Sequence, residues 1–189
     1  MQRIIITTTL FFCALAHAQS QEDGPDSRAA KRPPAPTKLG AKWGVLIGDW
    51  SGEGGGNPGS GSGTSSFQFD LQQQVLVRRS HSEYPAAGNR PATVHDDLMV
   101  IYPDSGNEQS RAIYFDNEGH VINYSATWSA GGDVVTFVSK ATPGTPQFRL
   151  VYKKVDDQTW TISFEMAPPG QPEAFKPYVS GRLRRTSGK

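Results

Sequence analysis

The chain has 189 residues, and its 19 Lys and Arg nearly balance its 18 Asp and Glu. No long basic block interrupts this balance, so the sequence predicts neither a nucleic-acid partner nor attachment to a membrane surface. Cys13 is the only cysteine, so the chain cannot close a disulfide on itself. A folded domain in this chain must therefore depend on a hydrophobic core.

Residues 1–18 have the layout of a secretory signal peptide. A positive residue, Arg3, precedes an apolar run over 4–15, and Ala16-His17-Ala18 forms a small-x-small cleavage site. The run is shorter than the roughly 20 residues that a membrane-spanning helix needs. We therefore expect an exported protein, periplasmic or extracellular, without a stable membrane anchor.

Residues 19–38 are polar and contain four prolines. This composition predicts a disordered spacer, so the folded domain is expected over 39–189. A short lid helix or turn is expected over 39–46, with Trp43 packed on the mouth of the domain.

Glycine alternates with other residues over 48–56, where every second position is Gly except for Trp50. Alternate residues of a strand share a face, so one face of this strand carries Trp50 and almost no other side chain. A bare face lets the strand bend sharply or lets another backbone approach closely, as a barrel corner requires. The segment predicts the first strand of a small closed barrel, with Trp50 buried at one end.

The rest of the chain alternates between short apolar-polar runs and turn signals, without a helical period. A flexible loop is predicted over 57–66, and strands are predicted over 65–71, 74–84, 95–102, 110–116, 120–128, 133–139, 147–155, 159–166 and 175–185. Turn signals recur every 8–12 residues or so, which is typical of antiparallel barrels and sandwiches. The sequence predicts an all-β protein, a single antiparallel up-and-down barrel of about 8–10 strands.

The glycine-alternating segment resembles the opening strand of calycin-like barrels, with the Gly-x-Trp of lipocalins and a closer likeness to the haem-binding nitrobindins. The layout is also similar to a bacterial group of lipocalin-like barrels without assigned function. Nitrobindins follow the motif with Tyr-Pro and bind haem iron through a His near the C-terminus. Here Asn57-Pro58-Gly59 follows, and the last histidine is His120. We therefore expect no haem and no other cofactor.

Histidines and carboxylates gather at three places, around His81, His95 and His120. These are metal-ligating residue types, but their spacing does not bring three ligands together, so no metal site is predicted. Asn117 and Gly119 favour a surface hairpin at the third place. No nucleophile motif is present, and no catalytic residue is predicted.

The alternation predicts two apolar sets facing the barrel interior, one over 148–152 and one over 160–166. Arg182 and Arg184 share a face of the last strand, and the resemblance implies a late basic residue that packs over the opening Trp or reaches a ligand carboxylate. The alternative for both is a solvent-facing charge. The predicted ligand-binding residues are Trp50, His81, His95, Tyr114, Tyr124, Phe148, Tyr152, Trp160, Phe164, Arg182 and Arg184.

These patterns favour a secreted barrel that binds a small apolar or amphipathic molecule. Two alternatives remain open at this stage. A small-molecule isomerase or hydrolase would hold His81 or His95 beside a carboxylate inside the cavity. A filled barrel would have no cavity larger than a few waters and would act as an envelope-associated interaction domain. The sequence gives no oligomeric state.

Overall fold

The computed structural model describes residues 38–104 and 109–186. The predicted signal peptide over 1–18 lies outside the described residues, as does the predicted spacer over 19–38 except for Lys38. Within the described part of the chain, no helix has the length and apolar character needed to cross a membrane.

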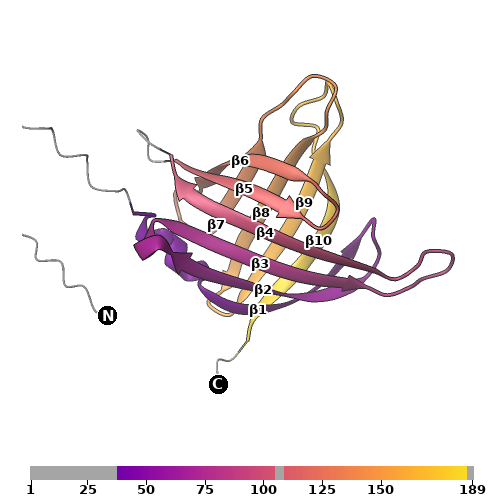
Figure 1. Ribbon diagram of the computed structural model, residues 1–189, viewed down its shortest axis with the longest axis horizontal. Coiled ribbons are helices and arrows are strands. Elements are labelled where there is room, and N and C mark those ends of the chain that lie inside the picture. Colours follow the sequence, from indigo (N-terminus) through magenta and orange to yellow (C-terminus); the bar gives the residue numbers. More distant parts are fainter. Residues whose placement is uncertain (1–37, 105–108, 187–189) are drawn as a thin grey trace, which may run out of the picture. The chain divides into compact units, whose positions relative to one another are not determined.

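The described residues form ten β-strands and two short 3₁₀ helices. The helices are η1 (Ala41–Leu46) and η2 (Leu71–Gln73), and the strands are β1 (Gly48–Gly56), β2 (Gly61–Asp70), β3 (Val75–Tyr84), β4 (Thr93–Pro103), β5 (Ser110–Asp116), β6 (Val121–Trp128), β7 (Val134–Ser139), β8 (Gln147–Asp156), β9 (Thr159–Ala167) and β10 (Lys176–Arg185). Each strand pairs antiparallel with the next along the chain, and β1 pairs with β10 (Figure 1). The predicted all-β class and single up-and-down barrel are therefore confirmed.

The barrel closes along a glycine-rich seam between its first and last strands, where Trp50 to Gly56 pair with Arg185 to Val179 (Figure 1). A Cβ on Gly54 would lie 2.3 Å from the carbonyl oxygen of Ser180. Only glycine tolerates so close a backbone, which is the close approach that the bare strand face predicts.

Strand β2 begins at Gly61, whereas the sequence predicts a loop over 57–66 and a strand from residue 65. That prediction is wrong because the segment pairs on both sides: Gly61 lies opposite Gly54 of β1, and Ser62 lies opposite Glu83 of β3. Glycine and serine carry little strand preference of their own. The two neighbouring strands, rather than the local sequence, fix this conformation.

One end of the interior is closed by η1, the lid helix that the sequence predicts. Trp43 is fully buried, and its ring centroid lies 5.2 Å from that of Trp128 and 5.9 Å from that of Phe137. The Leu39 amide donates a hydrogen bond to the Gln73 carbonyl at 2.9 Å, which ties the segment before η1 to the turn after β2. The barrel is therefore packed at this end.

The two predicted apolar sets face the interior. Leu150, Tyr152 and Trp160 are buried in the core, and Phe148, Ile162 and Phe164 pack against it. The register agrees, since Tyr152 pairs with Ile162 and Leu150 with Phe164 on neighbouring strands. The inward assignment is confirmed for these six residues, whereas the packing of Met166, the last member of the second set, stays a prediction.

Candidate functional site

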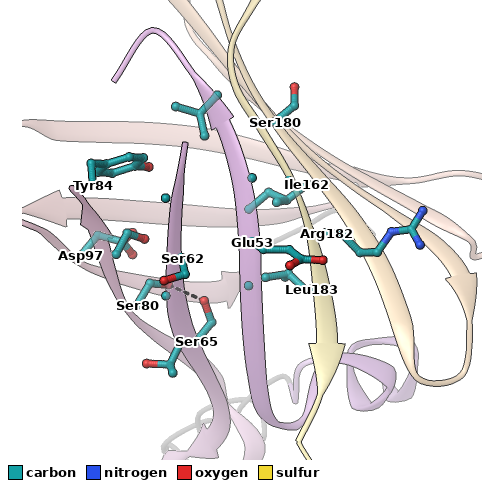
Figure 2. Close-up of a pocket in the computed structure, with 18 of the residues that line it drawn as sticks. Glu53, Ser62, Ser65, Ser80, Tyr84, Asp97, Ile162, Ser180, Arg182 and Leu183 are labelled. Carbon is teal, nitrogen blue, oxygen red and sulfur yellow. Dashed lines mark hydrogen bonds between the residues drawn. The ribbon is translucent and has the colours of Figure 1, made fainter. Parts of the chain in front are cut away.

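A cavity of about 120 Å³ lies against the inner face of β1, β2, β3 and β10 (Figure 2). Glycines form much of its wall, at positions that the register places on the inner face: Gly52, Gly54, Gly61, Gly63 and Gly181. Because glycine has no side chain, the interior stays open here, whereas larger side chains fill it beside the other strands. The glycine pattern that bends the sheet thus also creates the cavity.

Hydroxyl groups line one side of this cavity. Ser65 of β2 and Ser80 of β3 share a hydrogen bond with 2.9 Å between their Oγ atoms (Figure 2), and Ser82 and Tyr84 follow on β3. Burial raises the pKa of the Tyr84 phenol, so this group stays protonated at neutral pH. Serine and tyrosine hydroxyls both donate and accept hydrogen bonds, so this wall suits a polar ligand group.

Apolar side chains complete the wall on the side of β9 and β10. They are Ile162, Val179 and Leu183. A ligand in the cavity would therefore meet hydrocarbon on one side and hydroxyls on the other.

A buried ion pair lies in the cavity wall. Arg78 of β3 donates to the Asp97 carboxylate of β4 and to the Tyr152 hydroxyl of β8, and the side chains of Arg78 and Asp97 are only 3% and 9% exposed. Burial opposes the charge on Arg78, but the adjacent Asp97 carboxylate outweighs it, so the pKa of the guanidinium is raised. Buried charges persist only when they are paired, as this pair is.

His95 extends this polar cluster toward the protein surface. Its Nε2 lies 2.8 Å from the Tyr114 hydroxyl and 3.9 Å from Asp97 Oδ2, while its Nδ1 lies 3.1 Å from Glu118. Burial, followed by the charge of Asp97, raises the pKa of Tyr114. The isomerase or hydrolase alternative expects a histidine beside an interior carboxylate, and His95 has that neighbour. In the described residues, however, His95 does not line the cavity itself.

His81 lies on the outer face of the barrel and is exposed. It bridges Asp96 and Glu83, with Nδ1 2.7 Å from the former and Nε2 3.1 Å from the latter. The hydrogen bond with Asp96, then that with Glu83, raises the pKa of His81. A second hollow of about 510 Å³ includes His81 and Arg79 among its lining residues. Because its side chain points outward, His81 does not line the interior cavity. Contact of His81 with a ligand stays a prediction.

The predicted aromatic residues occupy inward positions but form packed clusters. Ring centroids of Trp128 and Trp160 lie 6.4 Å apart, and Phe148 stacks on Phe164 at 5.8 Å. In the described residues, none of the predicted aromatic ligand contacts lines the cavity: Trp50, Tyr114, Tyr124, Phe148, Tyr152, Trp160 and Phe164. Glycine and serine therefore line the open space in place of these rings, whose contact with a ligand stays a prediction.

Arg182 and Arg184 are exposed on the outer face of β10. Arg182 lies opposite Glu53 in the strand register, and Figure 2 shows its guanidinium pointing away from Ser65 and Ser80. Arg182 contributes to the cavity wall, but the expectation that its side chain or that of Arg184 points inward is wrong. Alternate positions of β10 face inward, and these are Gly181 and Leu183.

The arginine of the last strand that contacts the opening tryptophan is Arg185. Its guanidinium lies over the Trp50 ring, 4.2 Å from the centroid, and it donates hydrogen bonds to the carbonyls of Val45 and Ile47. Trp50 is buried, and its indole N–H donates to the Leu46 carbonyl at 2.8 Å. The predicted burial of Trp50 beneath a late arginine is confirmed, with Arg185 as that residue.

Sequence reasoning missed Arg78, although a signal for it exists. Arg78 alternates with the buried Leu76 and with Ser80, so the period of two places it on the inner face. Asp97 likewise alternates with the buried Met99 on β4. What the pattern does not show is that the two charges meet, because that requires the pairing register of β3 and β4.

Metal ligands do not gather in this site: among the described residues, no group of three or more His, Cys, Asp or Glu side chains could hold a metal ion.

Comparison with known proteins identifies the fold only. No family model matches the chain, and no curated protein matches it. The chain is similar to the crystal structure of Rv2717c from M. tuberculosis, with a TM-score of 0.56 and 16% identity over 79% of this chain and 99% of that chain. At this identity the likeness shows a shared barrel fold. Membership of a calycin-like family stays a prediction from the opening motif.

Proposed function

We propose that the protein binds a small amphipathic molecule in the cavity beside the glycine seam. The observation that carries this proposal is a solvent-accessible cavity against the inner face of the barrel, with the buried Arg78–Asp97 pair in its wall. Apolar walls with a few well-placed polar groups are typical of small-molecule sites.

The volume of the cavity limits the ligand. At about 30 Å³ per water molecule, 120 Å³ corresponds to about four waters. Sites for drug-sized ligands usually measure roughly 300–1,000 Å³. The ligand is therefore compact, or only its head group enters the cavity.

The wall favours an amphipathic ligand over a purely apolar one, the two classes that the sequence leaves open. A purely apolar molecule would displace water from Asp97 and from the serine hydroxyls without replacing its hydrogen bonds. Leaving buried polar groups unpaired costs about 1–3 kcal/mol each. An amphipathic ligand avoids this cost, because its polar end takes the place of the water.

The place of action belongs to the same proposal. The signal-peptide layout over 1–18 supports export to the periplasm or beyond, with ligand binding outside the cytoplasm and without a membrane anchor. N-terminal sequencing of the exported protein should begin at Gln19. Retention of Met1, or a lipid on Cys13, would contradict export by this route.

Native mass spectrometry of the exported protein tests binding directly. We expect a bound small molecule on the parent protein and its loss from Ser82→Leu, which places a larger apolar side chain in the cavity wall. Ser51→Leu is the matched control, because Ser51 is exposed on the outer face of β1. The same bound mass on all three proteins would place the ligand elsewhere. No bound mass on the parent protein would favour the filled-barrel interaction domain.

A further inference from the structure

We infer that Asp97 makes the cavity selective for ligands with an uncharged, hydrogen-bond-donating head group, such as a hydroxyl or a primary amide, and that it excludes carboxylates. This inference rests on the proposed function, since it names the chemistry of the ligand in the same cavity.

The charges in the cavity wall cancel. Four charged residues contribute to the wall in the described part of the chain: Glu53, Arg78, Asp97 and Arg182. Glu53 and Arg182 lie opposite each other in the pairing of β1 and β10, and both side chains are exposed on the outer face of the seam. Arg78 and Asp97 are the two that face inward, and they form a salt bridge with each other. The cavity therefore has no net charge to offer to an ion.

An ionic head group would be unfavourable in such a cavity. A carboxylate would lose part of its hydration and meet Asp97, while Arg78, the cation beside Asp97 in the wall, is already neutralised. A cation would gain from Asp97 but would be opposed by Arg78. An uncharged head group gives up less hydration and meets no repulsion, so it is the class that fits.

The hydrogen-bonding atoms of Asp97 favour a donor in particular. Oδ1 accepts from Arg78, whereas no hydrogen bond to Oδ2 is found in the described chain. The nearest candidate, Nε2 of His95, lies 3.9 Å from Oδ2, which is too long for a hydrogen bond. An ionised carboxylate only accepts, so the complementary ligand group is an O–H or N–H. The hydroxyls of Ser65 and Ser80 can form hydrogen bonds with the other polar atoms of the same head group.

The inference is tested with probes that share a four-carbon skeleton and differ in their head group: butan-1-ol, butyramide, butyrate and butylammonium. Affinities are measured by ligand-observed NMR titration at about pH 7.5, where butyrate and butylammonium are both ionised. We expect the alcohol and the amide to bind the parent protein at least about tenfold more tightly than either ion. Butyrate binding as tightly as butyramide would overturn the inference and leave the proposed function intact.

The Asp97→Asn variant tests the role of the residue itself. It keeps the shape of the side chain but removes the charge that neutralises Arg78, so the affinity for butyrate should rise by about tenfold or more relative to that for butyramide. Glu53→Gln is the matched control, because it removes a carboxylate from the outer face of the same wall. It should leave the order of the four probes unchanged. An unchanged order in Asp97→Asn would overturn the inference.

Loss of Asp97 also weakens the fold, so a second readout is needed. A ligand that binds only the folded state raises the melting temperature. The probe for this readout is formate, a carboxylate without the four-carbon chain. If Asp97 excludes carboxylates, formate should raise the melting temperature of Asp97→Asn more than that of the parent protein or of Glu53→Gln. An equal response of all three proteins would contradict the inference even if the NMR titration fails. If no probe binds the parent protein, the proposed function itself is contradicted.

Discussion

Replacing Trp50 by alanine should destabilise the barrel more than most single substitutions. The side chain is 1% exposed, its N–H donates to the Leu46 carbonyl at 2.8 Å, and Arg185 lies 4.2 Å above its ring. Truncating a buried Trp costs about 3–5 kcal/mol. We expect the upper part of this range, because a buried hydrogen bond of about 1 kcal/mol and a cation–π contact of about 0.5–1 kcal/mol are lost together with the packing. Total stabilities are about 5–15 kcal/mol, so much of the margin would disappear.

Urea unfolding at equilibrium, monitored by circular dichroism, measures this loss. Trp50→Phe keeps an aromatic face beneath Arg185 and loses the hydrogen bond, so it should cost about 1–2 kcal/mol. Phe115→Ala is the control at an exposed ring, 40% accessible on β5, and should cost less than about 1 kcal/mol. A free energy of unfolding for Trp50→Ala within about 1 kcal/mol of the parent value would refute the packed end of the barrel.

Three further changes test other parts of the structure. Gly54→Ala would place a methyl group 2.3 Å from a carbonyl oxygen of the neighbouring strand, and we expect a loss of about 1–3 kcal/mol in urea unfolding. The hydrogen bond with Asp96 raises the pKa of His81, so an NMR titration should place that pKa above 6.5. Protonated His81 then stabilises the fold fully below pH 6.5, and this stabilisation disappears as the pH rises through the folded-state pKa. Arg78→Gln leaves Asp97 buried without its partner and should lower the free energy of unfolding by about 3–5 kcal/mol. The double variant Arg78→Gln, Asp97→Asn should recover part of that loss.

Each of these has a control or an outcome that would contradict it. Gly44→Ala is the matched glycine change, because a Cβ there meets nothing within 4 Å, and it should be neutral or slightly stabilising. Asp96→Asn should lower the pKa of His81, and a value at or below 6.5 in the parent protein would argue against the bridging contacts. Strict additivity of the Arg78 and Asp97 changes would mean that the two charges do not interact.

The order of strands and turns follows from the sequence because both signals are local. A period of two puts Leu150 and Tyr152 on one face, and glycine sets the turn at Gly119, where φ is +90°. The alternating glycines around Trp50 indicate a strand that lies close to another backbone, as Gly54 does. These features need only neighbouring residues, so they can be found before any tertiary contact is known.

The site was decided by tertiary structure, because it depends on which inward positions are filled and which are empty. The sequence places aromatic rings inside the barrel but does not show that they pack against each other, so that the open space falls beside glycines and serines. Arg78 meets Tyr152 across 74 residues of chain, and it meets Asp97 only because β3 pairs with β4 in one register. A shift of that register by one residue would turn one of these charges outward. Local patterns therefore determine the barrel, whereas closure and register determine the charged cavity within it.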